Sequence, residues 1–300
     1  LLGRPNVGKS TVFNALTGPR QHTGNWPGKT VTSAQGRCER GGRGYVLVDL
    51  PGTYSLMAHS AEEEVARDFL CFGGADGAVV VCDATCLERN LNLVLQTLEL
   101  QPRTVVCVNL LDEAERKGVR VELEALSRRL GVPVVGAPAG RGEGLEALMA
   151  AVEGVISAPE PPTPVPVRYP PPVEFAVASL RPLLEPRLRG RLPARWTALR
   201  LLEGDGAFLD RLSAALEWDP RADAALWGAV EEARAVLERQ GLGGGAWCER
   251  VVSALVETAE AIGAASVTQL RSAAGRREQR LDRLLTSRAT GIPLMLLLLA

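Results

Sequence analysis

The sequence is short of several residue types, and each shortage argues against a class of protein. Its 300 residues include 6 cysteines, none of them in a C-x-x-C pair, which disfavours a secreted disulfide scaffold and a zinc ribbon and fits a reducing cytoplasm. Cys82 lies in an apolar run with no histidine nearby, so Cys82 and its neighbour Cys86 are predicted to be buried thiols. The 2 histidines, His22 and His59, are predicted to be solvated. The 34 basic and 35 acidic residues nearly cancel, so no basic field indicates binding to nucleic acid.

Residues 1–157 alternate between short apolar runs and amphipathic stretches. Continuous apolar strands that alternate with helices predict an α/β fold, in which a mostly parallel sheet has helices on both faces. Ligands of such sheets bind at the carboxyl ends of the strands. The expected strands are 45–50, 77–83, 104–109 and 132–135, and the expected helices are 61–72, 88–98, 122–130 and 145–156.

A proline-rich segment separates this part from a helical one. Residues 158–172 read APEPPTPVPVRYPPP, and because proline neither continues a helix nor donates to a sheet, they predict a stiff linker at a domain boundary. From 173 to 288 the apolar residues recur at three-to-four spacing, which predicts an all-α helical domain. The expected helices are 173–188, 194–203, 208–216, 221–240 and 246–262, the fourth starting at Asp219-Pro220, and the expected packing residues are Trp196, Trp218, Trp227 and Trp247.

The first motif that carries chemistry is GRPNVGKS, which begins at Gly3 and matches G-x-x-x-x-G-K-[ST] at every fixed position. The glycines let backbone N–H groups curl around a β-phosphate. Lys9 is expected to reach the β- and γ-phosphates, and the Ser10 hydroxyl is expected to ligate Mg²⁺. The motif therefore predicts a P-loop nucleotide site.

Further motifs follow in the order that a GTPase needs. Asp49 opens the sequence DLPG directly after a strand, where its carboxylate would hold Mg²⁺ through water and the Gly52 N–H would touch the γ-phosphate. Thr30 lies in a glycine-rich loop between the two motifs, where its hydroxyl can close over Mg²⁺. The sequence NLLD matches N-x-x-D, in which the Asp112 carboxylate can accept two hydrogen bonds that guanine offers and adenine does not.

Three features reduce the expected affinity for guanine nucleotide or the expected rate of GTP hydrolysis. Leu110 stands where most GTPases have the lysine of N-K-x-D, and Pro138-Ala139-Gly140 is the nearest match to the usual S-A-x loop, so we expect weak binding and fast nucleotide exchange. No glutamine follows Gly52 to orient the attacking water. Hydrolysis must then use another group, the backbone or a cation.

These motifs, in their wider context, resemble a known family. The segments GNWPGKT from Gly24, DLPGTYSL from Asp49 and NLLDEA from Asn109 resemble the bacterial ferrous iron transport protein B family. Leucine at position 110 is usual in that family, whereas Pro138 departs from its usual serine. The resemblance covers the whole chain. It implies a GTP-binding domain at 1–157, the linker at 158–172, a helical domain at 173–288 that acts on nucleotide release, and then a polytopic membrane domain.

The resemblance also implies a K⁺ site. Asn6, with backbone carbonyls around Gly24 and Trp26, would hold K⁺ against the phosphates and offset the developing charge. The predicted catalytic residues are Lys9, Asn6, Thr30 and Gly52, and the predicted Mg²⁺ ligands are Ser10, Thr30 and Asp49. The predicted GTP/GDP-binding residues are Gly3, Arg4, Pro5, Asn6, Val7, Gly8, Lys9, Ser10, Thr11, Gly28, Lys29, Thr30, Val31, Thr32, Asp49, Leu50, Pro51, Gly52, Asn109, Leu110, Leu111, Asp112, Pro138, Ala139 and Gly140.

The end of the chain, taken alone, fits a buried terminal helix as well as the start of a membrane helix, because residues 291–300 are only ten almost unbroken apolar residues. The resemblance favours the membrane helix, because 281–285 resembles the entry to the family's first membrane helix and the basic stretch before 291 is typical of the cytoplasmic side. Residues 289–300 are therefore expected to begin a truncated transmembrane helix. The resemblance implies a location at the cytoplasmic face of the bacterial inner membrane, Fe²⁺ as the transported ion, and small accessory iron-transport proteins and a homo-oligomer as possible partners.

Two other functions compete with a K⁺-stimulated GTPase of an iron transporter. Soluble GTPases of ribosome assembly or tRNA modification share GRPNVGKS, but Trp26 and Leu110 disfavour them because those proteins have another switch loop and usually N-K-x-D. A degenerate nucleotide sensor with little turnover is favoured by Leu110, Pro138 and the missing glutamine.

Overall fold

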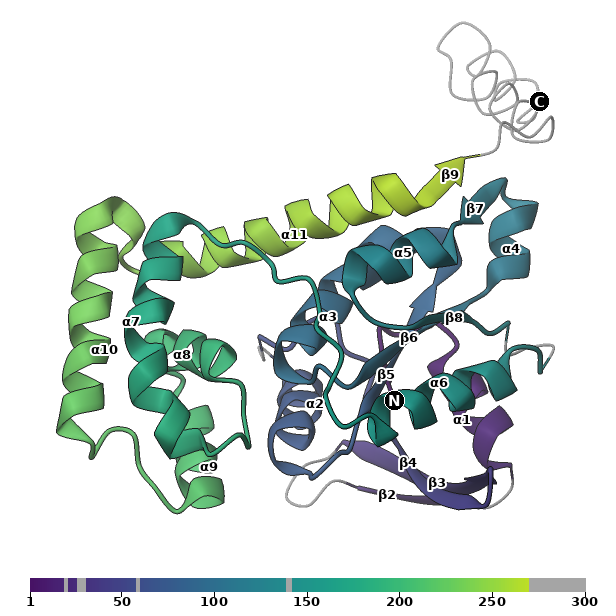
Figure 1. Ribbon diagram of the computed structural model, residues 1–300, viewed down its shortest axis with the longest axis horizontal. Coiled ribbons are helices and arrows are strands. Elements are labelled where there is room, and N and C mark those ends of the chain that lie inside the picture. Colours follow the sequence, from purple (N-terminus) through teal and green to yellow (C-terminus); the bar gives the residue numbers. More distant parts are fainter. Residues whose placement is uncertain (19–20, 26–30, 58–59, 139–141, 270–300) are drawn as a thin grey trace, which may run out of the picture.

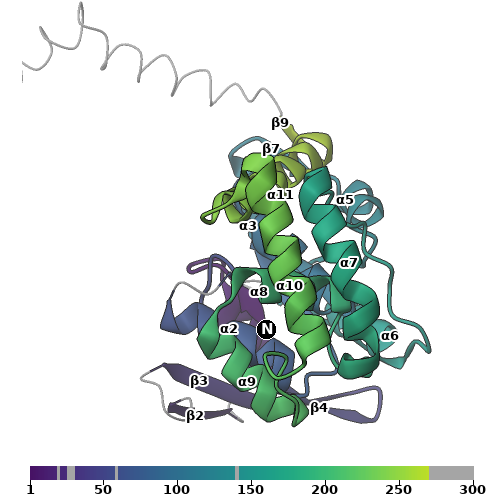
Figure 2. The ribbon, with the colours of Figure 1, turned by 90° about the vertical axis from the view of Figure 1, so that its left-hand side faces the viewer.

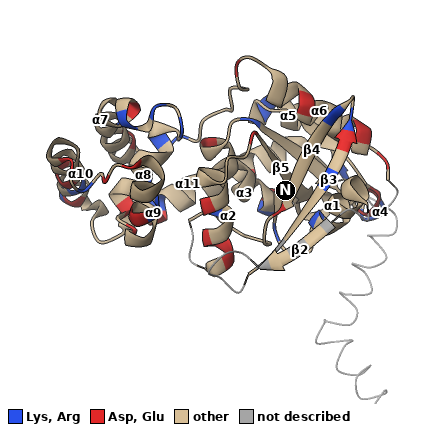
Figure 3. Cartoon of the chain, turned by 90° about the horizontal axis from the view of Figure 1, so that it is seen from below, with Lys and Arg blue, Asp and Glu red and all other residues tan. Residues whose placement is uncertain are grey.

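The chain folds into an α/β part and a helical part, joined along one side by a long helix (Figure 1). The computed structural model describes residues 1–18, 21–25, 31–57, 60–138 and 142–269. In Figure 3, basic and acidic residues are interspersed over both parts. The predicted fold class, an α/β domain followed by an all-α one, is confirmed.

The centre of the α/β part is a parallel sheet in the order β1-β5-β6-β8. Its strands are β1 (Leu2–Gly3), β5 (Ala78–Asp83), β6 (Thr104–Asn109) and β8 (Val134–Gly136). Alternate residues of β5 and β6 enter two separate apolar cores, with Val80 and Val106 in one and Val81 and Val105 in the other. Both faces are buried, which is why these strands are continuous apolar runs.

The strand expected at 45–50 belongs to a different sheet, and this corrects the sequence-based prediction. It is β4 (Arg43–Asp49), which pairs antiparallel with β3 (Thr32–Arg40), and β3 pairs antiparallel with β2 (Gln21–Asn25). Val46 of β4 is 64% exposed, whereas its neighbours Tyr45 and Leu47 pack against one apolar core and Val48 packs against the other. The Leu50 N–H donates to the Leu1 carbonyl (3.0 Å), so the end of β4 runs beside β1.

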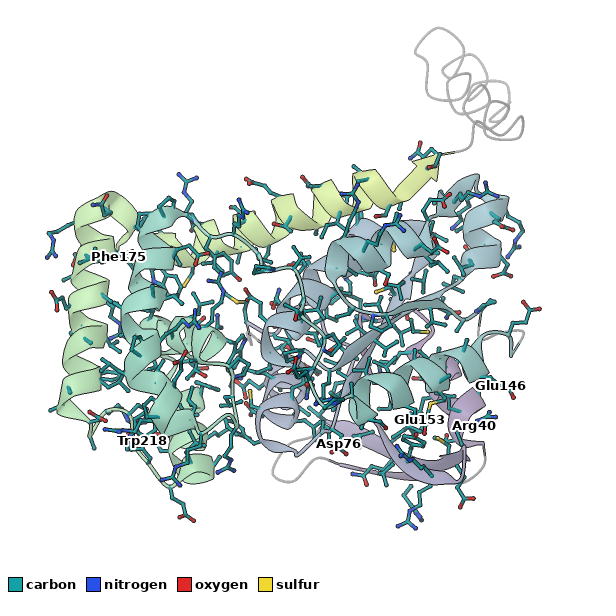
Figure 4. All side chains as sticks on the ribbon, viewed as in Figure 1. Arg40, Asp76, Glu146, Glu153, Phe175 and Trp218 are labelled. Atoms are coloured by element: carbon teal, nitrogen blue, oxygen red, sulfur yellow. The ribbon has the colours of Figure 1, made fainter. Side chains whose placement is uncertain are left out.

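Helices cover both faces of the parallel sheet. They are α1 (Lys9–Thr17), α2 (Ala61–Phe72), α3 (Leu87–Leu100), α5 (Leu123–Leu130) and α6 (Leu145–Ser157). α2 spans the predicted residues because Ser60 caps it, accepting a hydrogen bond from the Glu63 N–H (3.3 Å), and acidic residues fill its first turn. At the edge labelled in Figure 4, Arg40 of β3 pairs with Glu146 of α6 (3.5 Å), which ties the antiparallel sheet to α6.

The helical part contains α7 (Pro171–Leu188), α8 (Ala194–Glu203), α9 (Gly206–Leu216), α10 (Ala224–Leu237) and α11 (Ala246–Ser266). α7 and α10 run side by side (Figures 1 and 2). α10 begins later than predicted because Asp223, not Asp219, caps it; Asp219 instead accepts from the Arg221 N–H (2.9 Å). Trp196 and Trp247 are buried, and Trp218 and Trp227 pack against the same core.

The two parts share extensive contacts. α11 lies across α3 and α5, and β9 (Val267–Gln269), directly after it, pairs antiparallel with β7 (Val119–Val121) (Figure 1). Residues 161–170 have no regular secondary structure, and they contact the α/β part where the Val165 N–H donates to the Leu130 carbonyl (3.1 Å) and the Tyr169 hydroxyl donates to Glu99 Oε2 (2.7 Å). Among the described residues no helix has the length and apolar character that a membrane span requires. The predicted membrane helix at 289–300 lies outside them.

Candidate nucleotide site

The P-loop connects β1 to α1 at the carboxyl edge of the parallel sheet. Its glycines are required by close approach: a Cβ on Gly3 would lie 2.8 Å from the Val81 carbonyl oxygen, and one on Gly8 (φ 81°) would collide with the Asn109 side-chain amide. Asn6 is exposed and also has a positive φ (66°), so the backbone turns sharply at this residue. The loop has the shape expected of a phosphate cradle leading into a helix N-terminus.

Three predicted residues from two motifs meet beside this loop. The Lys9 ammonium pairs with Asp49 Oδ1, and the Ser10 hydroxyl donates to Asp49 Oδ2 (3.2 Å). The Lys9 and Asp49 side chains are only 10% and 12% exposed. A hydroxyl and a carboxylate at this distance form a hard oxygen donor set, which suits Mg²⁺. Lys9 and Ser10 lie in the first turn of α1, whose N–H groups and dipole favour an anion.

The DLPG segment lies directly against the P-loop. The Thr53 N–H donates to the Gly3 carbonyl (3.1 Å), and Gly52 packs against Pro5 so closely that a Cβ would come within 3.1 Å of Pro5 Cγ. Leu50 is buried beneath the segment, and Pro51 and Gly52 are half-buried. Gly52 therefore lies directly beside the P-loop.

The NLLD segment forms the other end. Asn109, the last residue of β6, is buried, and its side-chain amide donates to the Val7 carbonyl (3.0 Å), which braces the P-loop. Leu110 has φ 59° and turns the chain into the short helix α4 (Leu111–Arg116). Asp112 lies in the first turn of α4, 31% exposed, with Arg116 Nη2 at 3.9 Å.

The remaining predicted residues divide into described and undescribed ones. Pro138 follows β8 and is half-buried, Val31 is buried, and Thr32 and Gly24 lie in β3 and β2. Arg4, Pro5, Val7 and Thr11 belong to the P-loop and α1, and Leu111 begins α4. The predicted residues Trp26, Gly28, Lys29, Thr30, Ala139 and Gly140 lie outside the described residues.

The predictions about cysteine and histidine are partly confirmed. Cys82 is buried, but Cys86 is only half-buried, and its sulfur lies 3.6 Å from the Asn90 amide. Burial raises the pKa of Cys107, a third buried thiol of the sheet, to about 12, so it stays protonated at neutral pH. His22 is exposed as predicted, whereas His59 lies outside the described residues. The described residues contain no cluster of His, Cys, Asp and Glu that could hold a metal ion.

Gln96, and the contact between Arg4 and Tyr54, were not predicted from sequence. Gln96 of α3 is buried, and its Oε1 accepts hydrogen bonds from the Ser55 hydroxyl (2.9 Å) and the Leu56 N–H (2.7 Å). The Arg4 guanidinium lies over the Tyr54 ring, 4.7 Å from its centroid. A glutamine on the apolar face of a helical pattern was a usable signal for Gln96, because a buried polar side chain needs partners. Arg4 was predicted as part of the P-loop, but nothing in that motif indicates its contact with Tyr54.

Comparison with known proteins connects the two parts of the chain to one family. The family model described as "Ferrous iron transport protein B" matches residues 1–152, and the model described as "FeoB cytosolic helical domain" matches 169–268. Among curated relatives, the "Fe(2+) transporter FeoB" of Escherichia coli (strain K12) is 41% identical over 209 residues, 68% of this chain and 26% of that protein. The protein of the same name from Salmonella typhimurium (strain LT2) is 48% identical over 157 residues, 51% of this chain and 20% of that protein. The chain thus spans about a quarter of the length of these relatives or less.

Solved structures resemble the chain over most of its length. The crystal structure of an S. thermophilus NFeoB mutant bound to GDP has a TM-score of 0.76 and 28% identity, covering 89% of this chain and 98% of that one. The cytosolic domain of the T. maritima FeoB iron transporter in its GMPPNP form has a TM-score of 0.69 and 30% identity, covering 89% and 97%. Both family models and both structures agree with the observed order of an α/β part followed by a helical part. The chain belongs to the ferrous iron transport protein B family.

Proposed function

We propose that this chain binds and hydrolyses GTP as the cytosolic region of a membrane transporter for ferrous iron. The observation that carries the proposal is the meeting of Lys9, Ser10 and Asp49 beside the P-loop, because two separate motifs supply one phosphate and Mg²⁺ site. The GDP and GMPPNP forms of the similar structures support a guanine nucleotide as the ligand.

Each site residue has a role in this proposal. Lys9 leaves Asp49 and binds the β- and γ-phosphates, and the Gly52 N–H donates to the γ-phosphate. Ser10, Thr30 and Asp49 would hold Mg²⁺, which neutralises phosphate charge when bound. Asp112 would read the guanine edge. The Ala139 N–H would reach the guanine oxygen. Pro138 and Leu110 would leave the base less covered, so the bound nucleotide would exchange fast.

Because no glutamine follows Gly52, another group must stabilise the transition state of hydrolysis. Asn6 is exposed on the P-loop, and we propose that its side-chain oxygen, with carbonyls near Gly24 and Trp26, would hold K⁺. Such an ion would offset negative charge that grows on the phosphates, as an arginine finger does. Asn6 would then affect turnover more than binding.

The proposal extends to the rest of the protein. The boundaries remain 1–157 for the GTP-binding domain, 158–172 for the linker, 173–288 for the helical domain and 289–300 for the first membrane helix. The membrane domain would carry Fe²⁺ across the bacterial inner membrane, with this region at the cytoplasmic face and small accessory iron-transport proteins or further copies of the chain as partners. The family relationship disfavours a ribosome-assembly or tRNA-modification GTPase.

A nucleotide sensor with little turnover is the remaining alternative, favoured by Leu110 and Pro138. Steady-state phosphate release from GTP, measured in K⁺ and in Na⁺, separates the two functions. We expect turnover at least ~10-fold faster in K⁺, because only about 1.4 kcal/mol of differential stabilisation is required. Lys9→Ala should abolish turnover, and Asn6→Ala should remove most of the K⁺ effect while GTP binding remains. Phosphate release no faster than that of Lys9→Ala in either salt would support the sensor instead.

A further inference from the structure

Residues 51–57, which follow β4, have no regular secondary structure but are held in place from both sides. The segment contains Gly52, whose N–H is proposed to contact the γ-phosphate. One set of contacts comes from the P-loop and the other from α3. The two sets involve Arg4, which was predicted above only as a member of the P-loop, and Gln96, which belongs to none of the motifs.

On the P-loop side, the Arg4 guanidinium lies 4.7 Å from the centroid of the Tyr54 ring, in cation–π geometry. The Thr53 N–H donates to the Gly3 carbonyl (3.1 Å) in the same region. Tyr54 is 55% exposed, so little else packs against its ring. The position of the Tyr54 ring therefore depends on Arg4.

On the α3 side, the anchor is Gln96, which is only 5% exposed. Its Oε1 accepts from the Ser55 hydroxyl (2.9 Å) and the Leu56 N–H (2.7 Å), and its Nε2 donates to Asn92 Oδ1 (3.2 Å). Because the Leu56 N–H can only donate, the amide oxygen of Gln96 must face the segment. The Ser55 hydroxyl also accepts from the Met57 N–H (3.0 Å), so the turn after Gly52 is organised around one glutamine.

We propose that Arg4 and Gln96 form a clamp that positions Gly52 for the γ-phosphate before the nucleotide binds. Both are positioning residues, because they act through residues 53–56 rather than on the nucleotide. A donor that is already aimed at the site costs no reorganisation when charge develops on the phosphate. GDP has no γ-phosphate, so the clamp should matter for GTP and GMPPNP and not for GDP. The inference rests on the proposed GTPase function.

The test measures the affinities of fluorescent GDP and GMPPNP, together with kcat and KM for GTP, below the melting temperature of each variant. Gln96→Leu removes both acceptor contacts at similar volume, and we expect at least ~10-fold weaker GMPPNP binding and at least ~10-fold lower kcat, with GDP affinity within ~2-fold of the parent. Gln96→Glu keeps an acceptor oxygen toward Ser55 and Leu56 but loses the Nε2 donor to Asn92, so it should restore part of the GMPPNP affinity and of kcat. Arg4→Ala, whose contact is more exposed, should have the same pattern with a smaller effect.

Gln101→Leu is the matched control. Gln101 follows α3 and also bonds to the backbone, donating to the Ala75 carbonyl (3.2 Å), but it does not contact residues 51–57. The Gln101→Leu variant should leave the ratio of GDP affinity to GMPPNP affinity unchanged. If Gln96→Leu does not fold, Ser55→Ala removes one bond of the clamp from the other partner and should weaken GMPPNP binding alone.

The outcomes separate the clamp from the proposed function. Parental GMPPNP affinity and kcat in a folded Gln96→Leu protein would overturn the clamp, and so would an equal loss of GDP and GMPPNP affinity, which indicates a general structural role. If the parent protein does not hydrolyse GTP, the GTPase proposal is wrong. If the Gln96→Leu variant of that protein still loses GMPPNP affinity and keeps GDP affinity, the clamp is retained.

Discussion

At the scale of single residues, the same side chains serve the fold and the candidate site. Asn109 ends a buried strand and braces the P-loop through the Val7 carbonyl (3.0 Å), so the asparagine of N-x-x-D holds the two ends of the site together. The Asp112 side chain, by contrast, is 31% exposed, and its Oδ2 lies 3.9 Å from Arg116 Nη2. Asp112 is therefore the residue whose substitution should change the choice of base with the least effect on folding.

Asp112→Asn should shift the preference of the site from GTP to XTP. An amide nitrogen would donate to the oxygen that xanthine has where guanine has an amino group, while guanine would face a donor it cannot use. Hydrogen bonds to charged groups contribute about 1.5–3 kcal/mol, so GTP affinity should fall at least ~10-fold. Competition binding with GTP and XTP measures the shift. Glu113→Gln is the control, because Glu113 pairs with Lys117 (2.7 Å) on the same helix; a similar shift in that variant would show that Asp112 does not read the base.

The sequence predicted the residues at the phosphate end of the site, but not the contacts that Gln96 and Arg4 make with the segment after Gly52. The order of the motifs predicted that Lys9, Ser10 and Asp49 lie at one nucleotide site, and the structure brings them into contact although Asp49 ends a strand of the antiparallel sheet. Gln96 was missed because its role depends on which turn of α3 faces the segment after Gly52, and this is set by tertiary packing. Arg4 occupies a variable position of the P-loop pattern, so nothing in the motif indicates its contact with Tyr54.

At the scale of elements, helices and buried strands were predictable and polar strands were not. α2 matches its predicted span because a cap and an apolar face define it. β2, with the sequence QHTGN, has neither apolar alternation nor β-branched enrichment beyond one threonine, so only its partner β3 identifies it as a strand. In β4, Val46 is exposed between the half-buried Tyr45 and Leu47, a pattern that the run of apolar residues concealed.

The contact between α2 and α9 contains a buried arginine. Arg67 is 1% exposed, its Nη1 donates to Asp205 (2.8 Å), its Nε donates to Asp68 (3.1 Å), and its guanidinium lies 5.1 Å from the centroid of the Phe208 ring. Arg67→Met should lower the free energy of unfolding by about 3 kcal/mol, because two carboxylates lose their buried partner. Urea denaturation measures this. Arg211→Met, which removes a 47% exposed partner of Asp68, should cost about 1 kcal/mol or less, and equal losses in both variants would contradict a special role for Arg67.

Asp205 should make the same contact sensitive to acid. Desolvation raises the pKa of Asp205, but the hydrogen bonds from Arg67 and from the N–H groups of Phe208 and Ala207 outweigh it, so the pKa is lowered overall. A lowered pKa in the folded state contributes stability above the ordinary value of 3.8 and loses it as pH falls through the folded value. Asp205→Asn keeps a good N-cap for α9 and should lose less stability than the parent between about pH 5 and pH 2. Urea midpoints across this range test it; parallel curves would refute the linkage.

At the scale of the whole molecule, the α/β and helical parts share one apolar core. It contains Leu91 and Val94 of α3, Trp196 and Leu199 of α8, and Leu255 of α11. β7 and β9 also join the two parts as a single ladder. A shared core of this kind makes independent unfolding of either part costly, because each would expose apolar surface that the other covers.

We therefore expect residues 1–269 to unfold in one calorimetric transition that GDP shifts upward as a whole. A ligand at 100 times its dissociation constant adds about 2.7 kcal/mol to the folded state, and if the two parts unfold together, the helical part shares this stability. Differential scanning calorimetry with increasing GDP measures the shift, and Lys9→Ala, which should not bind GDP tightly, is the control. Hydrogen exchange of α8 and α9 should slow on GDP addition in the parent and not in Lys9→Ala. Two transitions, with only the first moved by GDP, would mean that the helical part is stable on its own and that the shared core does not couple it to the nucleotide site.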